Sequence, residues 1–208
     1  RARLGKEMQR AESDIAREIG RDVDPDAIFR ARVALRALIG LHLNAPLTAA
    51  YRRLSDGASY SPDAASAGRR LLKNVCLDLL AATQERHAIQ LAAEQYHAAD
   101  NMTDRMAALS TLSFHAVPER AAVLDDFYRR YRDDPLIVDK WFVLQAMTPD
   151  PQTLDHVRSL TGHPAFSMSN PNRVRSLIGA FAQGNQTQFN RTDGAGYEFI
   201  VDKILELD

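Results

Sequence analysis

Apolar residues recur at steps of three and four along most of the chain, and this spacing constrains the fold more than any other feature. One set of such residues would share a single helix face: Leu71, Leu72, Val75, Cys76, Leu79 and Leu80. A later set would share the face of another helix: Val174, Leu177, Ile178 and Phe181. Such spacing is typical of helices with one buried face. No stretch alternates polar and apolar residues between turn signals, as a half-buried strand would. We therefore predict an all-α chain with essentially no sheet.

Helix starts are marked by a capping side chain followed by proline. The capping oxygen accepts a backbone N–H of the first turn, and proline suits the first position because it lacks an N–H. The pattern occurs at Asp24-Pro25, Ser61-Pro62, Asp134-Pro135, Asp150-Pro151 and Asn170-Pro171. We expect another start at Asp100 or Asn101 and a helix from Arg1 to Gly20. The polar stretches 55–68 and 184–196 are predicted to be surface loops within one domain.

The resulting architecture is about ten helices joined by short connections, which favour antiparallel packing of successive helices. The starts are unevenly spaced, which excludes a fixed repeat of the TPR or ankyrin type. We predict a single all-helical domain over residues 1–208, an irregular HEAT/armadillo-like superhelical array. The chain begins at Arg1, inside a predicted helix, and stops at Asp208 directly after an apolar stripe. We therefore expect an excised piece of a longer polypeptide.

Charge and cysteine content narrow the possible partners and compartment. The 26 Lys and Arg residues nearly balance 27 Asp and Glu residues, giving a formal net charge of -1. This balance disfavours a nucleic-acid partner and an anionic membrane surface. No apolar run approaches the roughly 18 residues that span a bilayer, and no signal peptide opens the chain. Cys76 is the single cysteine, so no intramolecular disulfide can form, which fits the cytoplasm.

Catalytic motifs are absent from the sequence. None of the six histidines belongs to an H-E-x-x-H zinc motif, and no cysteine pair, phosphate-binding glycine loop or G-x-S-x-G elbow occurs. Cys76 and Trp141 lie on apolar helix faces, where core packing is a better interpretation than reactivity or stacking. His97 and Asp100 could form a base and its orienting partner, but capping or surface hydrogen bonding is the commoner use of such a pair. The sequence predicts no catalytic centre and no metal site.

The segment from Phe166 to Arg175 is harder to explain by stability alone. It joins a polar loop to a capped helix start, with Arg173 and Arg175 in the first turn and a half. Cations are misplaced there because the N-terminal end of the helix dipole is positive. Two arginines would suit an anionic or carboxyl-bearing partner, or a buried ion pair with another domain. Solvated surface arginines are the competing interpretation.

Four strings together resemble the C-terminal domain of bacterial aminopeptidase N. They are LKNVCL (72–77), YHAADNMTD (96–104), VDKWFVLQ (138–145) and FSMSNPNRVRSLIGAF (166–181). They occur in the family's order and at comparable separations, covering about Asp24 to Asp208. The last string is long and unusual in composition, so the match is specific.

The resemblance implies a parent enzyme that is a zinc-dependent metallopeptidase. In this family zinc polarises the scissile carbonyl and activates water, with the Glu of H-E-x-x-H as general base. That machinery lies in an upstream thermolysin-like domain, so this chain would hold no cofactor and be inactive alone. Its partners would be the catalytic domain of the same polypeptide and the peptide substrate. The C-terminal domain encloses the active-site cavity and limits access to short peptides with a free N-terminus.

The resemblance also nominates site residues. The helix opened by N-P-N-R-x-R borders the family's cavity, which makes Arg175 the best candidate for a residue lining the substrate channel; Arg173 and Asn172 are weaker candidates. The family's chain continues past the position of Asp208 through further helices, so one face of the last helix would be uncovered here. The alternative is a free-standing α-solenoid that binds a protein or peptide on its concave face. An H-E-x-x-H motif in the upstream reading frame would separate the two.

Overall fold

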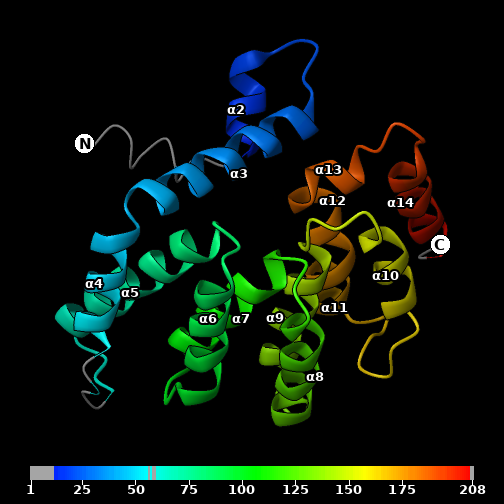
Figure 1. The fold of residues 1–208 in the computed structure, drawn as a ribbon. Helices are drawn as coiled ribbons and strands as arrows, with labels where there is room; N and C mark the ends of the chain where they lie inside the picture. The colour runs from blue at the N-terminus through cyan, green and yellow to red at the C-terminus, as the bar shows by residue number, and fades with distance from the viewer. Residues whose placement is uncertain (1–11, 56, 58–59, 207–208) are drawn as a thin grey trace. The chain divides into compact units, whose positions relative to one another are not determined.

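The computed structural model describes residues 12–55, 57 and 60–206, and all of its regular secondary structure is helical (Figure 1). The elements are α2 (Glu12–Ile19), α3 (Pro25–His42), α4 (Asn44–Leu54), α5 (Ala64–Ala81), α6 (Arg86–Ala98), α7 (Met102–Phe114), α8 (Glu119–Tyr131), α9 (Pro135–Ala146), α10 (Thr153–Leu160), α11 (Pro171–Val174), η1 (Arg175–Gly179), α12 (Ala180–Gly184), α13 (Gln186–Phe189) and α14 (Ala195–Leu205). The prediction of an all-α chain is confirmed. Residues 1–11 of the helix predicted from Arg1 to Gly20 lie outside the described residues.

The chain divides into two compact units. We call Leu35–Tyr131 the central unit, and Arg1–Ala34 together with Arg132–Asp208 the terminal unit. One boundary falls inside α3 and the other directly after α8. The single domain expected over residues 1–208 stays a prediction, and each unit is described by itself.

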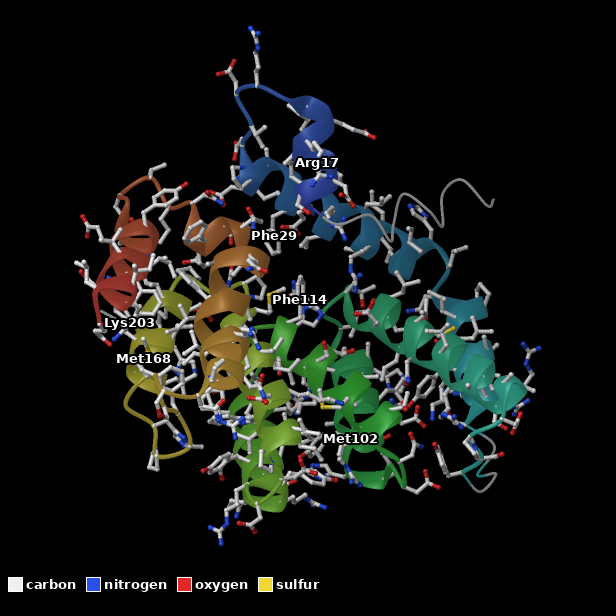
Figure 2. The ribbon with its side chains drawn as sticks, turned by 180° about the vertical axis from the view of Figure 1, so that it is seen from behind. Arg17, Phe29, Met102, Phe114, Met168 and Lys203 are labelled. Carbon is white, nitrogen blue, oxygen red and sulfur yellow. The ribbon has the colours of Figure 1, made fainter. Side chains whose placement is uncertain are left out.

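The central unit is built around α5, which packs against α4, α6 and α7, while α8 packs against α6 and α7. Its fully buried side chains include Leu77, Leu80, Tyr96, Leu109, Leu112 and Phe127. At Gly40 the backbone of α3 approaches α5 so closely that a Cβ atom would overlap the carbonyl oxygen of Leu79. Glycine is therefore required at this helix crossing. At the end of α7, the ring of Phe114 (labelled in Figure 2) faces the guanidinium of Arg36, whose carbon lies 6.0 Å from the ring centroid.

The apolar stripe predicted to form one buried face of α5 is buried only in part. Cys76, Leu79 and Leu80 are buried as expected. Leu71 and Val75 are 67% and 42% exposed, so the prediction is wrong for the first part of the stripe, in the middle of the helix. The neighbouring helices cover the side of α5 that carries Cys76 and Leu80, and periodicity alone does not show how far along a helix its neighbours reach.

The terminal unit is built around α9, which contacts α10, α11, η1 and α12; α13 then joins α12 to α14. Its core is rich in aromatic rings. Phe142 meets Phe166 edge-on with centroids 6.0 Å apart, and Phe181 meets Phe199 at 5.9 Å. Such geometry is favoured because the positive edge of one ring faces the negative face of the other.

Most predicted caps are confirmed. The carboxylate of Asp24 accepts the N–H of Ala27, and that of Asp134 accepts those of Leu136 and Ile137. Asn170 caps α11 by accepting the N–H groups of Asn172 and Arg173. At the start of α7, Asn101 rather than Asp100 is the cap, and it accepts the N–H of Asp104 at 2.9 Å.

Two predicted starts are wrong by two residues. Helix α5 is capped by Asp63, which accepts the N–H of Ser66, while the hydroxyl of Ser61 donates to Asp63. Hydrogen bonds from Ser61 and Ser66 lower the pKa of Asp63 and favour its charged, capping form. Asp150 accepts the N–H of Gln152, forming a turn before α10 rather than its cap. The stretches 55–68 and 184–196 are also less loop-like than predicted, because the first includes the start of α5 and the second contains α13 and the start of α14.

Helix α14 carries an exposed apolar face. Tyr197, Val201, Ile204 and Leu205 are 49%, 54%, 57% and 65% exposed, whereas Phe199 is buried. The uncovered face that the sequence predicted for this helix is present.

In the described part of the chain, no single helix is long and apolar enough to cross a membrane. Helices α3 and α4, bent by 80° at their junction, reach that length and apolar content only as a pair.

Candidate functional site

The helix predicted to border a substrate channel has an unusual backbone. Helix α11 opens at Pro171 and passes directly into the π-helix η1, which begins at Arg175 and continues as α12. Met168 marks the loop that leads into it (Figure 2). The sequence predicted an uninterrupted α-helix here, because a π-helical turn leaves no distinct apolar period. Such turns are rare and frequently occur at functional sites.

Arg173 points into the terminal unit and is only 8% exposed. Its Nε donates to the carbonyl of Ala165 at 2.9 Å, and its Nη1 donates to the carbonyl of Pro135 at 2.8 Å. Nη1 also forms an ion pair with Asp139. The guanidinium carbon lies 5.9 Å from the centroid of the Phe142 ring. The charge that looked misplaced on the helix dipole is thus paired within the same unit.

Asp139 joins three elements through one carboxylate. Its Oδ1 accepts from Arg173 on α11 and, at 3.1 Å, from the hydroxyl of Ser176 on η1. Because Asp139 belongs to α9, the start of α11 and the first turn of η1 are both attached to that helix. Sequence reasoning missed this residue. The available signal was a lone acidic residue in the apolar run from Leu136 to Leu144, because a charge buried among apolar side chains is normally paired.

Arg175 and Asn172 lie on the exposed side of the same segment. Nη1 of Arg175 donates to Oδ1 of Asn172 at 3.2 Å, and both residues are exposed. A guanidinium carries five N–H donors, and this bond uses one of them. The structure therefore brings two of the three predicted site residues together at the surface and directs Arg173 into the interior. The channel role of all three stays a prediction.

The loop before α11 is fixed by His163. The ring of His163 lies 5.2 Å from that of Trp141 and 6.0 Å from that of Phe142. Its Nδ1 accepts the N–H of Ala165 at 3.1 Å. This hydrogen bond fixes Ala165, whose carbonyl accepts the hydrogen bond from Arg173. Burial lowers the pKa of His163, which favours the neutral ring that this hydrogen bond requires.

The other residues singled out from the sequence occupy structural positions. Cys76 and Trp141 are buried, and the predicted core roles are confirmed. Burial raises the pKa of the Cys76 thiol, which disfavours the reactive thiolate. His97 and Asp100 are exposed, and Asp100 accepts a hydrogen bond from the side chain of Asn101. Within the described residues, no three His, Cys, Asp or Glu side chains are grouped so that they could hold a metal ion.

Comparison with known proteins gives concordant matches. Residues 10–208 match the family described as "Domain of unknown function (DUF3458_C) ARM repeats". Aminopeptidase N of Caulobacter vibrioides is 38% identical over 89% of this chain and 21% of its own length; that of Escherichia coli is 39% identical over the same shares. Aminopeptidase N of Haemophilus influenzae is 38% identical over 99% of this chain and 23% of its own length. The chain thus spans about a fifth of the length of these relatives.

A solved structure gives the same result. The crystal structure of Legionella pneumophila aminopeptidase A in complex with aspartic acid matches with a TM-score of 0.81 and 28% identity, over 89% of this chain and 23% of that one. The resemblance to bacterial aminopeptidase N and the prediction of an irregular armadillo-like helical fold are both confirmed.

Proposed function

We propose that this chain is the non-catalytic helical domain of a zinc-dependent aminopeptidase N. The proposal starts from the family of the chain, which belongs to the DUF3458_C family of ARM-repeat domains. In this proposal the parent enzyme removes N-terminal amino acids from peptides, and the domain encloses the active-site cavity and limits access to it. The observation that carries the proposal is the 38–39% identity to three aminopeptidases N over at least 89% of the chain. A match of that extent to a fifth of each relative is what a domain of the larger enzyme would give.

The zinc ion of the proposed parent would be held elsewhere in the polypeptide. The described residues contain no group of side chains that fits a metal, so no step of the reaction is assigned to them. The partners are the catalytic domain of the same polypeptide and the peptide substrate. The proposal places the protein in the cytoplasm, a location supported by the buried, unpaired Cys76.

Within this domain we assign substrate contact to Arg175, with Asn172 beside it. Arg175 is the exposed arginine of the N-P-N-R-x-R string, and its bond to Asn172 orients the guanidinium. Arg173 serves a different purpose, because its buried bonds fix the segment that carries Arg175. A guanidinium suits a carboxylate, which it can bind through two parallel N–H donors. The expected ligand is therefore the C-terminal carboxylate of a peptide.

The test is Arg175→Ala in the full parent enzyme, assayed on peptides of increasing length. Loss of a charge-assisted hydrogen bond should raise KM about tenfold for the peptide lengths whose carboxylate reaches Arg175, with kcat nearly unchanged. Arg158→Ala, which removes a partly exposed arginine from α10 of the same unit, is the matched control and should leave the length profile as it was. An unchanged profile in Arg175→Ala would refute the assigned contact.

The proposed parent is tested separately by the gene. A reading frame that encodes H-E-x-x-H and a distal Glu upstream of this segment supports the peptidase. A gene without that motif would leave the free-standing peptide-binding solenoid as the function.

A further inference from the structure

A cleft of about 530 Å³ lies within the central unit, and the segment that carries Arg175 contributes no residue to its lining. It is lined by residues from α4 to α7, among them Arg69, Arg70 and Lys73 on α5 and Glu94 and Gln95 on α6. Its volume falls within the range of small-molecule binding sites.

The floor of the cleft is a buried polar network centred on Asp104. Lys73 Nζ donates to Oδ2 of Asp104 at 2.5 Å, and Asn101 Nδ2 donates to the same oxygen at 3.2 Å. Oδ1 accepts from Asn74 Nδ2 at 3.0 Å. Burial raises the pKa of Asp104, but the hydrogen bonds from Lys73, Asn101 and Asn74 outweigh it and leave the pKa below its ordinary value. The Lys73–Asp104 pair is thus internally neutralised.

Gln95 completes this network on one side only. It is 6% exposed, and its Nε2 donates to Oδ1 of Asn74 at 2.8 Å and to the carbonyl of Asp104 at 3.0 Å. Its Oε1 is buried without a hydrogen-bond partner among the described residues. If the amide oxygen and nitrogen of Gln95 were exchanged, both of these hydrogen bonds would be lost. Oε1 is therefore the atom of this amide that has no partner among the described residues. A buried acceptor without a donor is costly to keep.

Arg70 supplies the complementary group. Its Nη1 donates to the carbonyl of Ser61 at 2.7 Å, and its guanidinium carbon lies 4.7 Å from the centroid of the Tyr60 ring. Its Nε is buried without an acceptor among the described residues. The described residues hold four such unpartnered buried side-chain atoms, on Arg70, Gln95, Glu119 and Gln188, and two of these residues line this one cleft.

The charges that line the cleft separate by helix. Arg69 and Arg70 lie on α5, whereas Glu94 lies near the end of α6 and Asp100 lies two residues beyond the end of that helix. The C-terminal end of a helix also favours a cation. Both the end of α6 and the carboxylates of Glu94 and Asp100 therefore attract positive charge to this side of the cleft. We propose that this cleft binds a small zwitterion, an amino acid or dipeptide, with its carboxylate at Arg70 and its ammonium at Glu94 and Asp100. The inference rests on the charges of the cleft and does not depend on the proposed peptidase function.

The experiment is calorimetric titration of the full 208-residue chain with L-alanyl-L-alanine. Two blocked forms, the N-acetyl dipeptide and the dipeptide amide, each remove one charge from the same skeleton. We expect saturable binding of the free dipeptide and about tenfold weaker binding of each blocked form. Arg70→Gln should lose the preference for the free carboxylate, and Glu94→Gln the preference for the free amine.

Two matched variants serve as controls. Arg129→Gln on α8 and Glu198→Gln on α14 remove the same charges from exposed sites outside the cleft lining and should bind as the unmodified chain does. Circular dichroism verifies that every variant is folded. Absence of saturable binding by the folded chain would overturn the proposal. So would equal binding of the blocked forms, or binding unaffected by both Arg70→Gln and Glu94→Gln.

Discussion

The two units each contain a buried ion pair that ties neighbouring helices together, and the surroundings of the two pairs differ. Around Arg173 and Asp139 in the terminal unit, the guanidinium donates to two carbonyls and one carboxylate, all within the unit. Around Lys73 and Asp104 in the central unit the carboxylate is equally well bonded, but neighbouring Gln95 keeps an unpartnered acceptor. The first arrangement is complete and positions a backbone segment. The second leaves one buried acceptor without a donor and borders a cleft with the volume of a small-molecule site.

The largest effect is expected from Arg173→Met, which breaks the complete arrangement. The change leaves Asp139 partly buried without its cation and frees the carbonyls of Pro135 and Ala165. Breaking a buried pair in this way costs about 3–5 kcal/mol of unfolding free energy. Urea denaturation followed by circular dichroism measures the loss. A loss below about 1 kcal/mol would show that the network is not structural.

A smaller loss is expected from Lys73→Met. Asn74 and Asn101 continue to donate to Asp104, so the carboxylate is not left bare. We expect the same urea titration to give a loss of about 2 kcal/mol, near the value of one hydrogen bond between charged groups. If Lys73→Met proved more damaging than Arg173→Met, the contrast between the two networks would be reversed.

The smallest effect concerns pH and His163. Its pKa is lowered by burial from an ordinary value of 6.5, so the unfolded chain binds a proton that the folded chain resists. The stability that depends on neutral His163 is therefore complete above about pH 6.5 and is lost as the pH falls through that value toward the folded pKa. His163→Gln should flatten part of this decline in melting temperature between neutral and mildly acidic pH. His87→Gln, an exposed histidine on α6, is the control, and equal slopes in both variants would contradict the assignment.

The sequence predicts the fold well where a single residue determines local structure. Asp24, Asn101, Asp134 and Asn170 cap helices as predicted, because an N-cap depends only on the next two or three backbone N–H groups. Ser61 fails because Asp63, two residues later, offers a stronger acceptor.

Features that depend on tertiary neighbours escape the same reasoning. Leu71 has the spacing of a buried position, yet its exposure depends on where the covering helices end. The directions of Arg173 and Arg175 are not distinguishable from their spacing, because the inward turn of Arg173 depends on Asp139, 34 positions earlier in the chain. The cleft beside Gln95 depends in part on contacts between residues far apart in the chain, such as Asn74 and Gln95, 21 positions apart, and Lys73 and Asp104, 31 positions apart. No local motif records such an arrangement.

The central claim is that this chain is a non-catalytic domain of a zinc aminopeptidase, and hydrolysis by the purified chain tests it most directly. An aminoacyl-anilide is incubated with the 208-residue chain, with added Zn²⁺ and again with a chelator. Because no group in the described residues fits a metal, we predict turnover no faster than buffer in either condition. Turnover by the chain that a chelator abolishes would contradict the account.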